Sequence, residues 1–328
     1  MRLLSVAILF LAFLSPLSAD EEQATNGAAE APAEETGSAP EFEARPVENL
    51  LEAQIELHRR GFSCGSIDGV RGLQTAAALK AFQRSTGLRE TGDLDNATRE
   101  ALLLTETALG EHIFTAEELS SLHPVPSTWV GKSEMDRLGY ATALELAAER
   151  HRANPKLLRQ LNPDVNWEEL MPGAVVQVPN VGTVLLEGKA ALLHVRLADR
   201  QLTVTDPDGK LIAFFPVSIA KMAEKRPIGQ LTIKVVIPDP NYTFDPAVFP
   251  ESAEAQTLDR KLILPPGPNN PVGVAWIGLD RPGYGIHGTP DPEKVGRTES
   301  HGCFRLANWD ARTLLALVDP GLPVVVEP

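Results

Sequence analysis

The chain is poor in cysteine, with only Cys64 and Cys303 among its 328 residues. One disulfide would use both sulfurs. The residues around Cys303, described below, indicate that this sulfur must stay a thiol. We therefore expect no structural disulfide and a small, buried side chain at Cys64.

Long hydrophobic runs are also missing, except at the N-terminus. Arg2 is followed by the apolar run LLSVAILFLAFLSPL, and Ser18 and Ala19 precede an acidic stretch that starts at Asp20. This order predicts a secretory signal peptide over residues 1–19 and a mature protein in the periplasm or cell envelope. The alternative is an uncleaved anchor. No later run approaches the ~20 apolar residues of a membrane span, so no membrane span is expected after signal removal.

Basic residues are too few to balance the acids, and the formal net charge is −14. This charge argues against nucleic acid and anionic membranes as partners. Residues 20–43 hold eight acids and no lysine or arginine. An Ala/Glu/Pro-rich stretch of this kind cannot bury a core, so residues 20–44 are predicted to be a disordered acidic linker.

Residues 45–106 have the apolar spacing of a small helical domain. One apolar stripe runs over 50–57 and ends at Gly61, a second runs over 76–82 and ends at Gly87, and residues 98–104 complete a third helix. The glycines between residues 65 and 72 indicate a tight, fixed turn. The segment LHRRGFSCGSIDGVRGLQTAAALKAFQRSTGLRETGDLDNATREAL resembles a three-helix peptidoglycan-binding domain. The alternative is a helical bundle without a ligand.

Residues 107–137 are interpreted as a connector, with a helix expected over 111–122 that the sequence HPVP ends. Trp129, His112 and His123 are interpreted as packing or surface residues. Residues 138–181 then predict two helices, over 143–153 and 155–161, and a strand over 175–179. The segments LAAERHRANPKLLRQLNP and LMPGAVVQVPN resemble the LysM module, which binds N-acetylglucosamine polymers. A degenerate module that only spaces the domains is the alternative.

From residue 184 the apolar pattern changes to a period of two. Strands are predicted over 193–197, 202–205, 211–219, 230–236, 274–279 and 322–326, with one helix over 309–318. The fold class is therefore multidomain α+β, in which a helical domain and a small α/β module precede a β-rich domain over residues 184–328.

The chemistry is concentrated in YGIHGT (residues 284–289) and SHGCFRL (residues 300–306). A thiol becomes a strong nucleophile when it ionises, and a nearby imidazole is the usual means. Interleaved glycines let the backbone approach a substrate and direct N–H groups at an oxyanion. By composition alone, a loop with a buried cysteine remains an alternative. A zinc site from His287, His301 and Cys303 is disfavoured by the two-residue spacing of the last pair, so neither a metal nor a cofactor is expected.

The segments PPGPNNPVGVAWIGL and YGIHGTPDPEKVGRTESHGCFRLANWD are similar to the L,D-transpeptidase catalytic domain, also called the YkuD domain, over about 140 residues. The resemblance implies that Cys303 is the nucleophile and His287 its base. It also implies that Ser300, His301 and Gly302 shape the loop, and that the N–H groups of Gly302 and Cys303 stabilise the oxyanion.

The same resemblance leaves several roles open. Arg305 could hold a substrate carboxylate or an internal acid, and Gly288 could line the substrate site. Trp276 and Tyr284 could line the cleft or pack in the core. The chain departs from the family pattern at Arg226, where threonine is usual, and at Phe304, where an aliphatic residue is common.

The implied function is an L,D-transpeptidase that acts on peptidoglycan stem peptides through a cysteine thioester. It would release terminal D-alanine and form 3→3 cross-links, or attach another amine acceptor on a neighbouring stem or wall-linked protein. Peptidoglycan, both stem peptide and glycan, is thus the expected partner. The alternatives are an L,D-carboxypeptidase or hydrolase of the same substrates, and a non-catalytic wall-binding protein.

Overall fold

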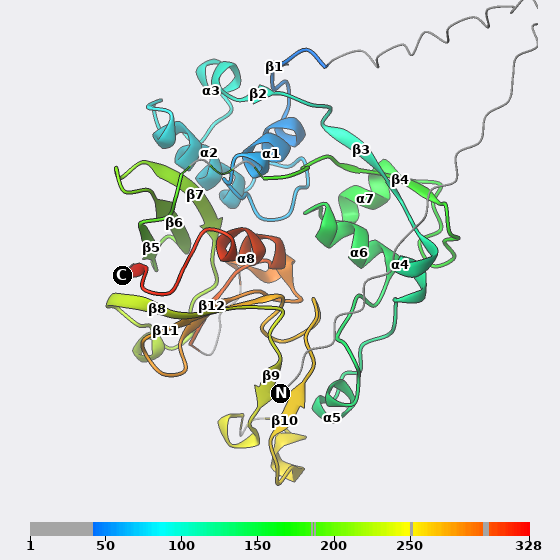
Figure 1. Ribbon diagram of the computed structural model, residues 1–328. Helices are drawn as coiled ribbons and strands as arrows, with labels where there is room; N and C mark the ends of the chain where they lie inside the picture. The colour runs from blue at the N-terminus through cyan, green and yellow to red at the C-terminus, as the bar shows by residue number, and fades with distance from the viewer. Residues whose placement is uncertain (1–41, 185, 187, 250–251, 298–301) are drawn as a thin grey trace, which may run out of the picture. The chain divides into compact units, whose positions relative to one another are not determined.

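The computed structural model describes residues 42–184, 186, 188–249, 252–297 and 302–328 (Figure 1). The predicted signal peptide, over residues 1–19, and nearly all of the predicted linker, over residues 20–44, lie outside these ranges. Phe42 to Pro328 form one compact unit. Within the described residues, no helix is long and apolar enough to cross a membrane.

Three helices and two short strands make up the N-terminal part of this unit. They are β1 (Arg45–Pro46), α1 (Leu50–Arg59), α2 (Leu73–Ser85), α3 (Asn96–Ala101) and β2 (Leu103–Leu104). Asn49 caps α1 and Asp95 caps α3, because each side chain accepts a backbone N–H of the first turn. The third helix ends earlier than predicted, since β2 pairs with β1 and closes the domain.

A strand–helix–helix–strand unit follows in the chain. Strands β3 (Leu109–Ile113) and β4 (Val175–Pro179) pair antiparallel. Apolar side chains of α6 (Ala143–Arg150) and α7 (Pro155–Leu161) form one hydrophobic core with those of β4. The helix predicted over 111–122 is wrong in its first turn, where β3 lies instead. Helix α4 (Ala116–Ser120) starts only after Thr115, whose capping box with Glu118 fixes its start.

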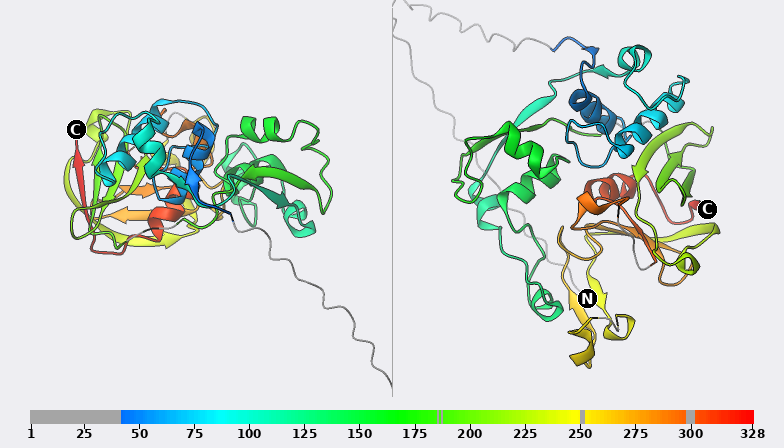
Figure 2. Two further views of the ribbon diagram at one scale, coloured as in Figure 1. Left: turned by 90° about the horizontal axis from the view of Figure 1, so that it is seen from above. Right: turned by 180° about the vertical axis from the view of Figure 1, so that it is seen from behind.

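An eight-stranded sheet forms the C-terminal part, in the order β13-β12-β11-β8-β14-β5-β6-β7. Its strands are β5 (Leu192–Arg196), β6 (Gln201–Thr205), β7 (Leu211–Pro216), β8 (Gly229–Pro238), β11 (Ala275–Leu279), β12 (Gly285–His287), β13 (Phe304–Arg305) and β14 (Pro323–Glu327). Neighbours pair antiparallel except β12 with β13 and β14 with β5. Figure 2 shows helix α8 (Asn308–Leu315) lying against this sheet.

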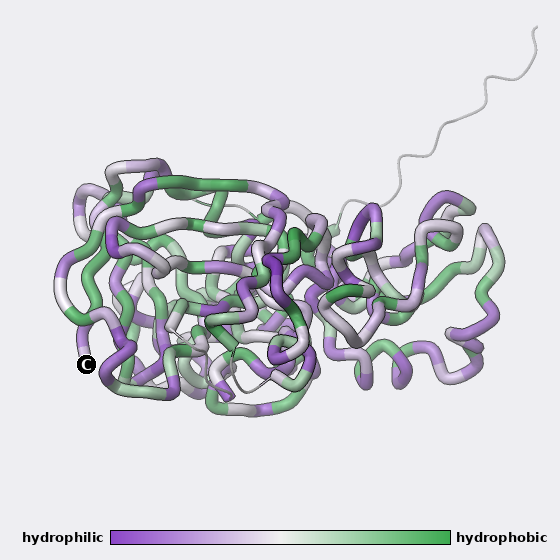
Figure 3. The backbone as a smooth tube through the Cα atoms, turned by 90° about the horizontal axis from the view of Figure 1, so that it is seen from below, coloured by the Kyte–Doolittle hydropathy of each residue, from purple (hydrophilic) through white to green (hydrophobic). Residues whose placement is uncertain are grey.

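The core of the sheet lies on the face that α8 covers. Its buried side chains include Ile277, Ile286 and Phe304 from three adjacent strands, and Ala311 and Leu314 from α8. Figure 3 shows apolar and hydrophilic residues interspersed along the chain. Residues between the core positions in each strand face the opposite side of the sheet.

A segment outside the eight-stranded sheet connects β8 to β11. It contains the strand pair β9 (Tyr242–Phe244) and β10 (Leu262–Leu264), with the 3-10 helices η2 (Pro246–Val248) and η3 (Ala255–Thr257). Helix α5 (Trp129–Ser133) packs on this pair, and Trp129 stacks on Phe244 with ring centroids 4.2 Å apart. Trp129 is thus a packing residue, as expected.

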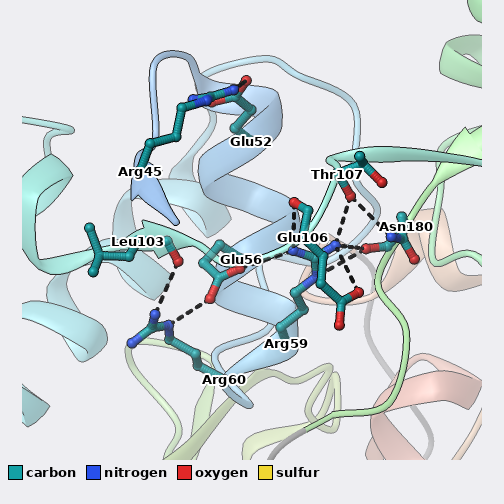
Figure 4. Close-up of polar contacts among 9 residues, drawn as sticks. All are labelled: Arg45, Glu52, Glu56, Arg59, Arg60, Leu103, Glu106, Thr107 and Asn180. Atoms are coloured by element: carbon teal, nitrogen blue, oxygen red, sulfur yellow. Dashed lines mark hydrogen bonds and ion pairs between the residues drawn. The ribbon is translucent and has the colours of Figure 1, made fainter. Parts of the chain in front are cut away.

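The helical domain and the strand–helix–helix–strand unit are joined through Arg59 near the end of α1. Its guanidinium donates to the carbonyl of Thr107, just before β3, and to that of Asn180, just after β4 (Figure 4). Glu56 pairs with Arg59 at 3.2 Å and with Arg60 at 2.9 Å. One buried cation therefore fixes one end of the β3–β4 pair, where β3 begins and β4 ends, against the helical domain.

Candidate active site

His287 is the last residue of β12, and Cys303 directly precedes the adjacent strand β13. Strands β12 and β13 pair in parallel, with Ile286 opposite Phe304 and His287 opposite Arg305. Ile286 and Phe304 both enter the core, so the residues on either side of them face the other side of the sheet. This alternation places His287 and Arg305 on the face away from α8 and, extended by one residue before β13, predicts the same face for Cys303.

The imidazole of His287 is held in one orientation. Its Nδ1 lies 2.6 Å from the carbonyl oxygen of Gly288, to which an Nδ1–H donates, and this tautomer leaves Nε2 able to accept a proton. The indole of Trp276 stacks on the imidazole, with centroids 5.8 Å apart. Burial lowers the pKa of His287 to about 4, against the upward influence of the Gly288 carbonyl. The ring is therefore neutral, as a base must be.

The Cys303 thiol lies beside backbone polar groups. Its Sγ lies 3.5 Å from the Gly283 carbonyl oxygen, to which the thiol donates. Burial raises the thiol pKa, while a hydrogen bond from the Gly285 backbone and the charge of Arg305 oppose that rise. Cys64 and Cys303, both among the described residues, are not joined in a disulfide. Cys303 is thus a neutral thiol and His287 a neutral imidazole.

Arg305 carries the positive charge of this face. Burial lowers its pKa, against the charges of Asp291 and Cys303. Its Nε is buried and has no hydrogen-bond partner among the described residues. A buried cationic donor without a partner favours an anion, such as a carboxylate, at this place.

Trp276 faces the site rather than the core, and two glycines make room for it. A Cβ at Gly285 would lie 2.7 Å from the indole, and one at Gly278 would lie 3.0 Å from its Nε1. Trp276 also lines a cavity of about 550 Å3 with Tyr242, Val272 and others. Tyr284, by contrast, packs against the core of the sheet.

Sequence reasoning missed Tyr242. Burial first, and the charge of Cys303 second, raise its pKa to about 12. Tyr242 lines the same cavity as Trp276 although it belongs to the segment between β8 and β11. No local motif marks Tyr242, because its place in the cavity depends on how that segment folds.

Asn308 was missed as well. Its Oδ1 accepts the backbone N–H of Val274 at 3.3 Å, and its Nδ2 donates to Glu149 at 2.8 Å. A Cβ at Gly288 would lie 2.3 Å from Asn308 Oδ1, and one at Gly273 would lie 2.0 Å from it. Gly288 therefore has a packing reason to be glycine, besides the carbonyl that orients His287. A polar residue at the start of a predicted helix was the only available signal for Asn308.

The remaining predicted site residues are placed only in part. Gly302 lies by the ring of Tyr284, 3.8 Å from the position of an added Cβ. Ser300 and His301 lie outside the described residues. Among the described residues, no group of three His, Cys, Asp or Glu side chains could hold a metal ion.

Comparisons with known proteins identify the family to which this chain belongs. Residues 190–326 match the L,D-transpeptidase catalytic domain, YkuD. A putative L,D-transpeptidase YkuD of Bacillus subtilis is 39% identical over 184 residues, which cover 56% of this chain and 92% of that protein. The chain belongs to the L,D-transpeptidase family. The Bacillus licheniformis protein of the same name is 26% identical over 56% of this chain and 93% of its own length.

The other matches say less about the family of this chain. Residues 47–102 match a putative peptidoglycan-binding domain, in agreement with the resemblance noted from the sequence. The crystal structure of L,D-transpeptidase 3 from Mycobacterium tuberculosis is 20% identical, covers 49% of this chain and 77% of that chain, and has a TM-score of 0.34. The family membership therefore rests on the sequence relatives.

Proposed function

We propose that the protein cross-links peptidoglycan stem peptides as a cysteine-dependent L,D-transpeptidase in the cell envelope. One observation supports the proposal: β12, which carries His287, pairs in parallel with β13, which starts directly after Cys303, and the Gly288 carbonyl holds the imidazole with Nε2 as acceptor. This pairing of thiol, base and orienting group supports acyl transfer.

The first half-reaction forms a thioester. The Cys303 Sγ–H proton moves to His287 Nε2 while sulfur bonds to the carbonyl carbon between the third stem residue and the terminal D-alanine. The carbonyl electrons move to oxygen and then return, which breaks the C–N bond. The imidazolium donates its proton to the leaving amine of D-alanine.

The second half-reaction passes the acyl group to an amine. An acceptor amine, typically the side chain of the diamino acid on a neighbouring stem, attacks the thioester carbonyl. His287 accepts a proton from that amine, the C–S bond breaks, and the proton returns to the sulfur. A thioester suits this transfer because amines compete well with water for it.

Nearby groups support both steps. The Arg305 guanidinium, with its partnerless buried Nε, would bind a substrate carboxylate. The backbone N–H groups of Gly302 and Cys303 are proposed as oxyanion donors. Ser300 and His301 are proposed to shape the same loop, and Gly288 to let the substrate backbone approach.

The N-terminal parts would bring the enzyme to its polymer. The helical domain is proposed to bind peptidoglycan, and the strand–helix–helix–strand unit to bind glycan as a LysM-like module. Export by a signal peptide over residues 1–19 completes this proposal, since the substrate lies outside the cytoplasm.

Two alternatives predict different products. A carboxypeptidase or hydrolase would form the same thioester and let water resolve it. A non-catalytic wall-binding protein would leave muropeptides unchanged, but the oriented imidazole of His287 favours catalysis.

Muropeptide digestion followed by mass spectrometry tests the proposal. The purified full chain, incubated with tetrapeptide muropeptides, should yield cross-linked dimers and free D-alanine. Trimmed monomers would favour the carboxypeptidase, and an unchanged mixture with tight sacculus binding would favour the binding protein.

A further inference from the structure

The loop that leaves β12 after His287 is held by residues from outside the catalytic domain. Within it, η4 (Pro292–Lys294) carries Glu293. Ser66 Oγ of the helical domain donates to one Glu293 oxygen at 2.6 Å. Asn154 Nδ2, at the start of α7, donates to the other at 2.7 Å. Each carboxylate oxygen thus bonds a different N-terminal part.

A third bond comes from Gln74 in α2. Its Nε2 donates to the carbonyl of Val295 at 2.8 Å. A Cβ at Gly65 would lie 2.4 Å from the Gln74 oxygen, and one at Gly296 would lie 2.9 Å from its nitrogen. Glycine on both sides therefore lets this side chain reach the loop.

The donors to Glu293 are joined to each other. The backbone N–H of Ile67 donates to Arg152, and the N–H of Asn154 donates to Ile67, both at 2.8 Å. Ser66 and Asn154 therefore flank one backbone bridge between the two N-terminal parts. They offer the carboxylate a single fixed surface.

The far side of the loop connects to the reacting groups. The backbone N–H of Gly296 donates to Ser218 Oγ at 2.9 Å, and Ser218 and Arg305 exchange two backbone hydrogen bonds. In addition, the charge of Asp291 acts on Arg305, and that of Arg305 acts on both His287 and Cys303. A displaced loop would therefore change the field at the thiol.

We propose that Glu293 is a positioning residue through which the helical domain and the strand–helix–helix–strand unit set the reactivity of Cys303. The N-terminal parts then take part in catalysis, beyond anchoring the enzyme to its polymer. The consequence for turnover rests on the proposed transpeptidase function, but the consequence for thiol reactivity does not.

A donor–acceptor swap in the full chain tests the proposal. In Glu293→Gln, the new amide can accept from only one of its two donors. In Asn154→Asp, two carboxylates face each other, while the helix cap is kept because Asp caps as well as Asn. In the double variant, the amide of Gln donates to the new carboxylate and its oxygen still accepts from Ser66. The contact is thereby restored with reversed polarity.

Asn166 and Glu169 provide a matched control. Asn166 Nδ2 donates to Glu169 at 2.9 Å within an exposed turn of the same unit. The Asn166→Asp and Glu169→Gln variants, single and combined, make the same chemical exchange away from the loop. They should leave the reactivity of Cys303 unchanged.

For each variant we would measure the alkylation rate of Cys303, the turnover of muropeptides and the thermal unfolding midpoint. The alkylation rate of Cys303 by iodoacetamide, located by mass spectrometry over a range of pH, reports the thiol itself. Turnover of tetrapeptide muropeptides gives kcat and KM separately, and thermal unfolding gives the midpoint. We expect each single variant at the loop to lower the alkylation rate and kcat roughly tenfold at similar KM, as misplacement of reacting groups does. The double variant should recover most of the loss.

Three results would overturn the proposal: alkylation rates equal to wild type, a lower unfolding midpoint with unchanged rates, or a double variant no faster than the slower single. A wild-type protein that is alkylated at Cys303 but transfers no acyl group would refute the transpeptidase function alone. The alkylation series would then still decide the role of Glu293.

Discussion

The surroundings of the two thiols, Cys64 and Cys303, differ in a way that separates structure from chemistry. Burial raises the pKa of both. At Cys64 the next influences, the charges of Asp68 and Asp310, raise it further. At Cys303 the next influences, a backbone hydrogen bond from Gly285 and the charge of Arg305, lower it.

The pKa and reactivity of a buried thiol therefore depend on the sign of the charges around it. Cys64 lies 3% exposed in the core of the helical domain, against apolar side chains. Cys303 lies half-buried directly before β13, where the charge of Arg305 lowers its pKa.

Replacement of the two cysteines should give the largest difference. Cys303→Ala removes the nucleophile, so cross-linking should fall by at least about 10³-fold, while sacculus binding persists. Cys64→Ala should keep nearly full activity. Muropeptide analysis and a pull-down with sacculi measure both properties. An active Cys303→Ala protein would end the thioester mechanism.

Loss of the base should have the next largest effect. His287→Gln removes proton transfer from the thiol and should lower kcat/KM by roughly 10²–10³-fold. A carbapenem should add its mass to Cys303 in the wild-type protein and far more slowly in this variant, as seen by intact-mass spectrometry. Equal rates would show that His287 does not serve the thiol.

Acid should inactivate the enzyme only at low pH. Because the pKa of His287 is about 4, kcat/KM should fall about tenfold per unit below that pH and stay level from pH 5 to 7. The buried neutral ring also affects stability. The unfolded chain binds the proton more readily, so this group lowers the free energy of unfolding as pH falls from about 6.5 to 4. An acid limb centred near pH 6.5 would contradict the assignment.

Arg305 should contribute a smaller factor. Arg305→Gln removes the charge that lowers the pKa of Cys303, so the pH profile of alkylation should shift to higher pH and kcat/KM should drop roughly tenfold. Arg305→Lys keeps the charge without the planar fork. It should therefore restore the alkylation profile while leaving KM raised. An unchanged profile in Arg305→Gln would exclude the electrostatic role.

The smallest effect concerns Cys64. Its replacement by alanine removes one sulfur from a packed core and should lower the free energy of unfolding by about 1 kcal/mol. Denaturant unfolding measures this change, with Cys303→Ala as the control that should unfold like wild type. A large loss of activity in Cys64→Ala would break the contrast between the two thiols.

Much of the sheet was predictable because its signal is local. Period-two alternation located six strands of the sheet to within a few residues, and α8 begins one residue before the helix predicted over 309–318. The short strands β12 and β13 were not predicted. The strand β3 was missed because Glu111 and His112 fit a helix equally well, and its partner β4 lies far along the chain. In the site, the resemblance of residues 284–306 to the family pattern led to the prediction of His287 and Cys303.

Other parts of the site depend on contacts between distant segments. Tyr242 shares a cavity with Trp276, Asn308 bonds Glu149, and Glu293 bonds two N-terminal parts. None of these side chains has a sequence pattern of its own. They are specified by tertiary packing, which a single sequence does not display.

Strand β7 ends the sheet, yet its outer side is occupied. Phe62 bridges to Phe214, and the carbonyls of Gly61 and Phe214 accept hydrogen bonds from Phe214 and Ser63. Leu211 and Phe214 also belong to the core of the helical domain. A catalytic domain cut at residue 184 would therefore expose a bare sheet edge with apolar flanks. Such an edge promotes strand-to-strand association between copies, so the helical domain also serves as an internal solubility cap.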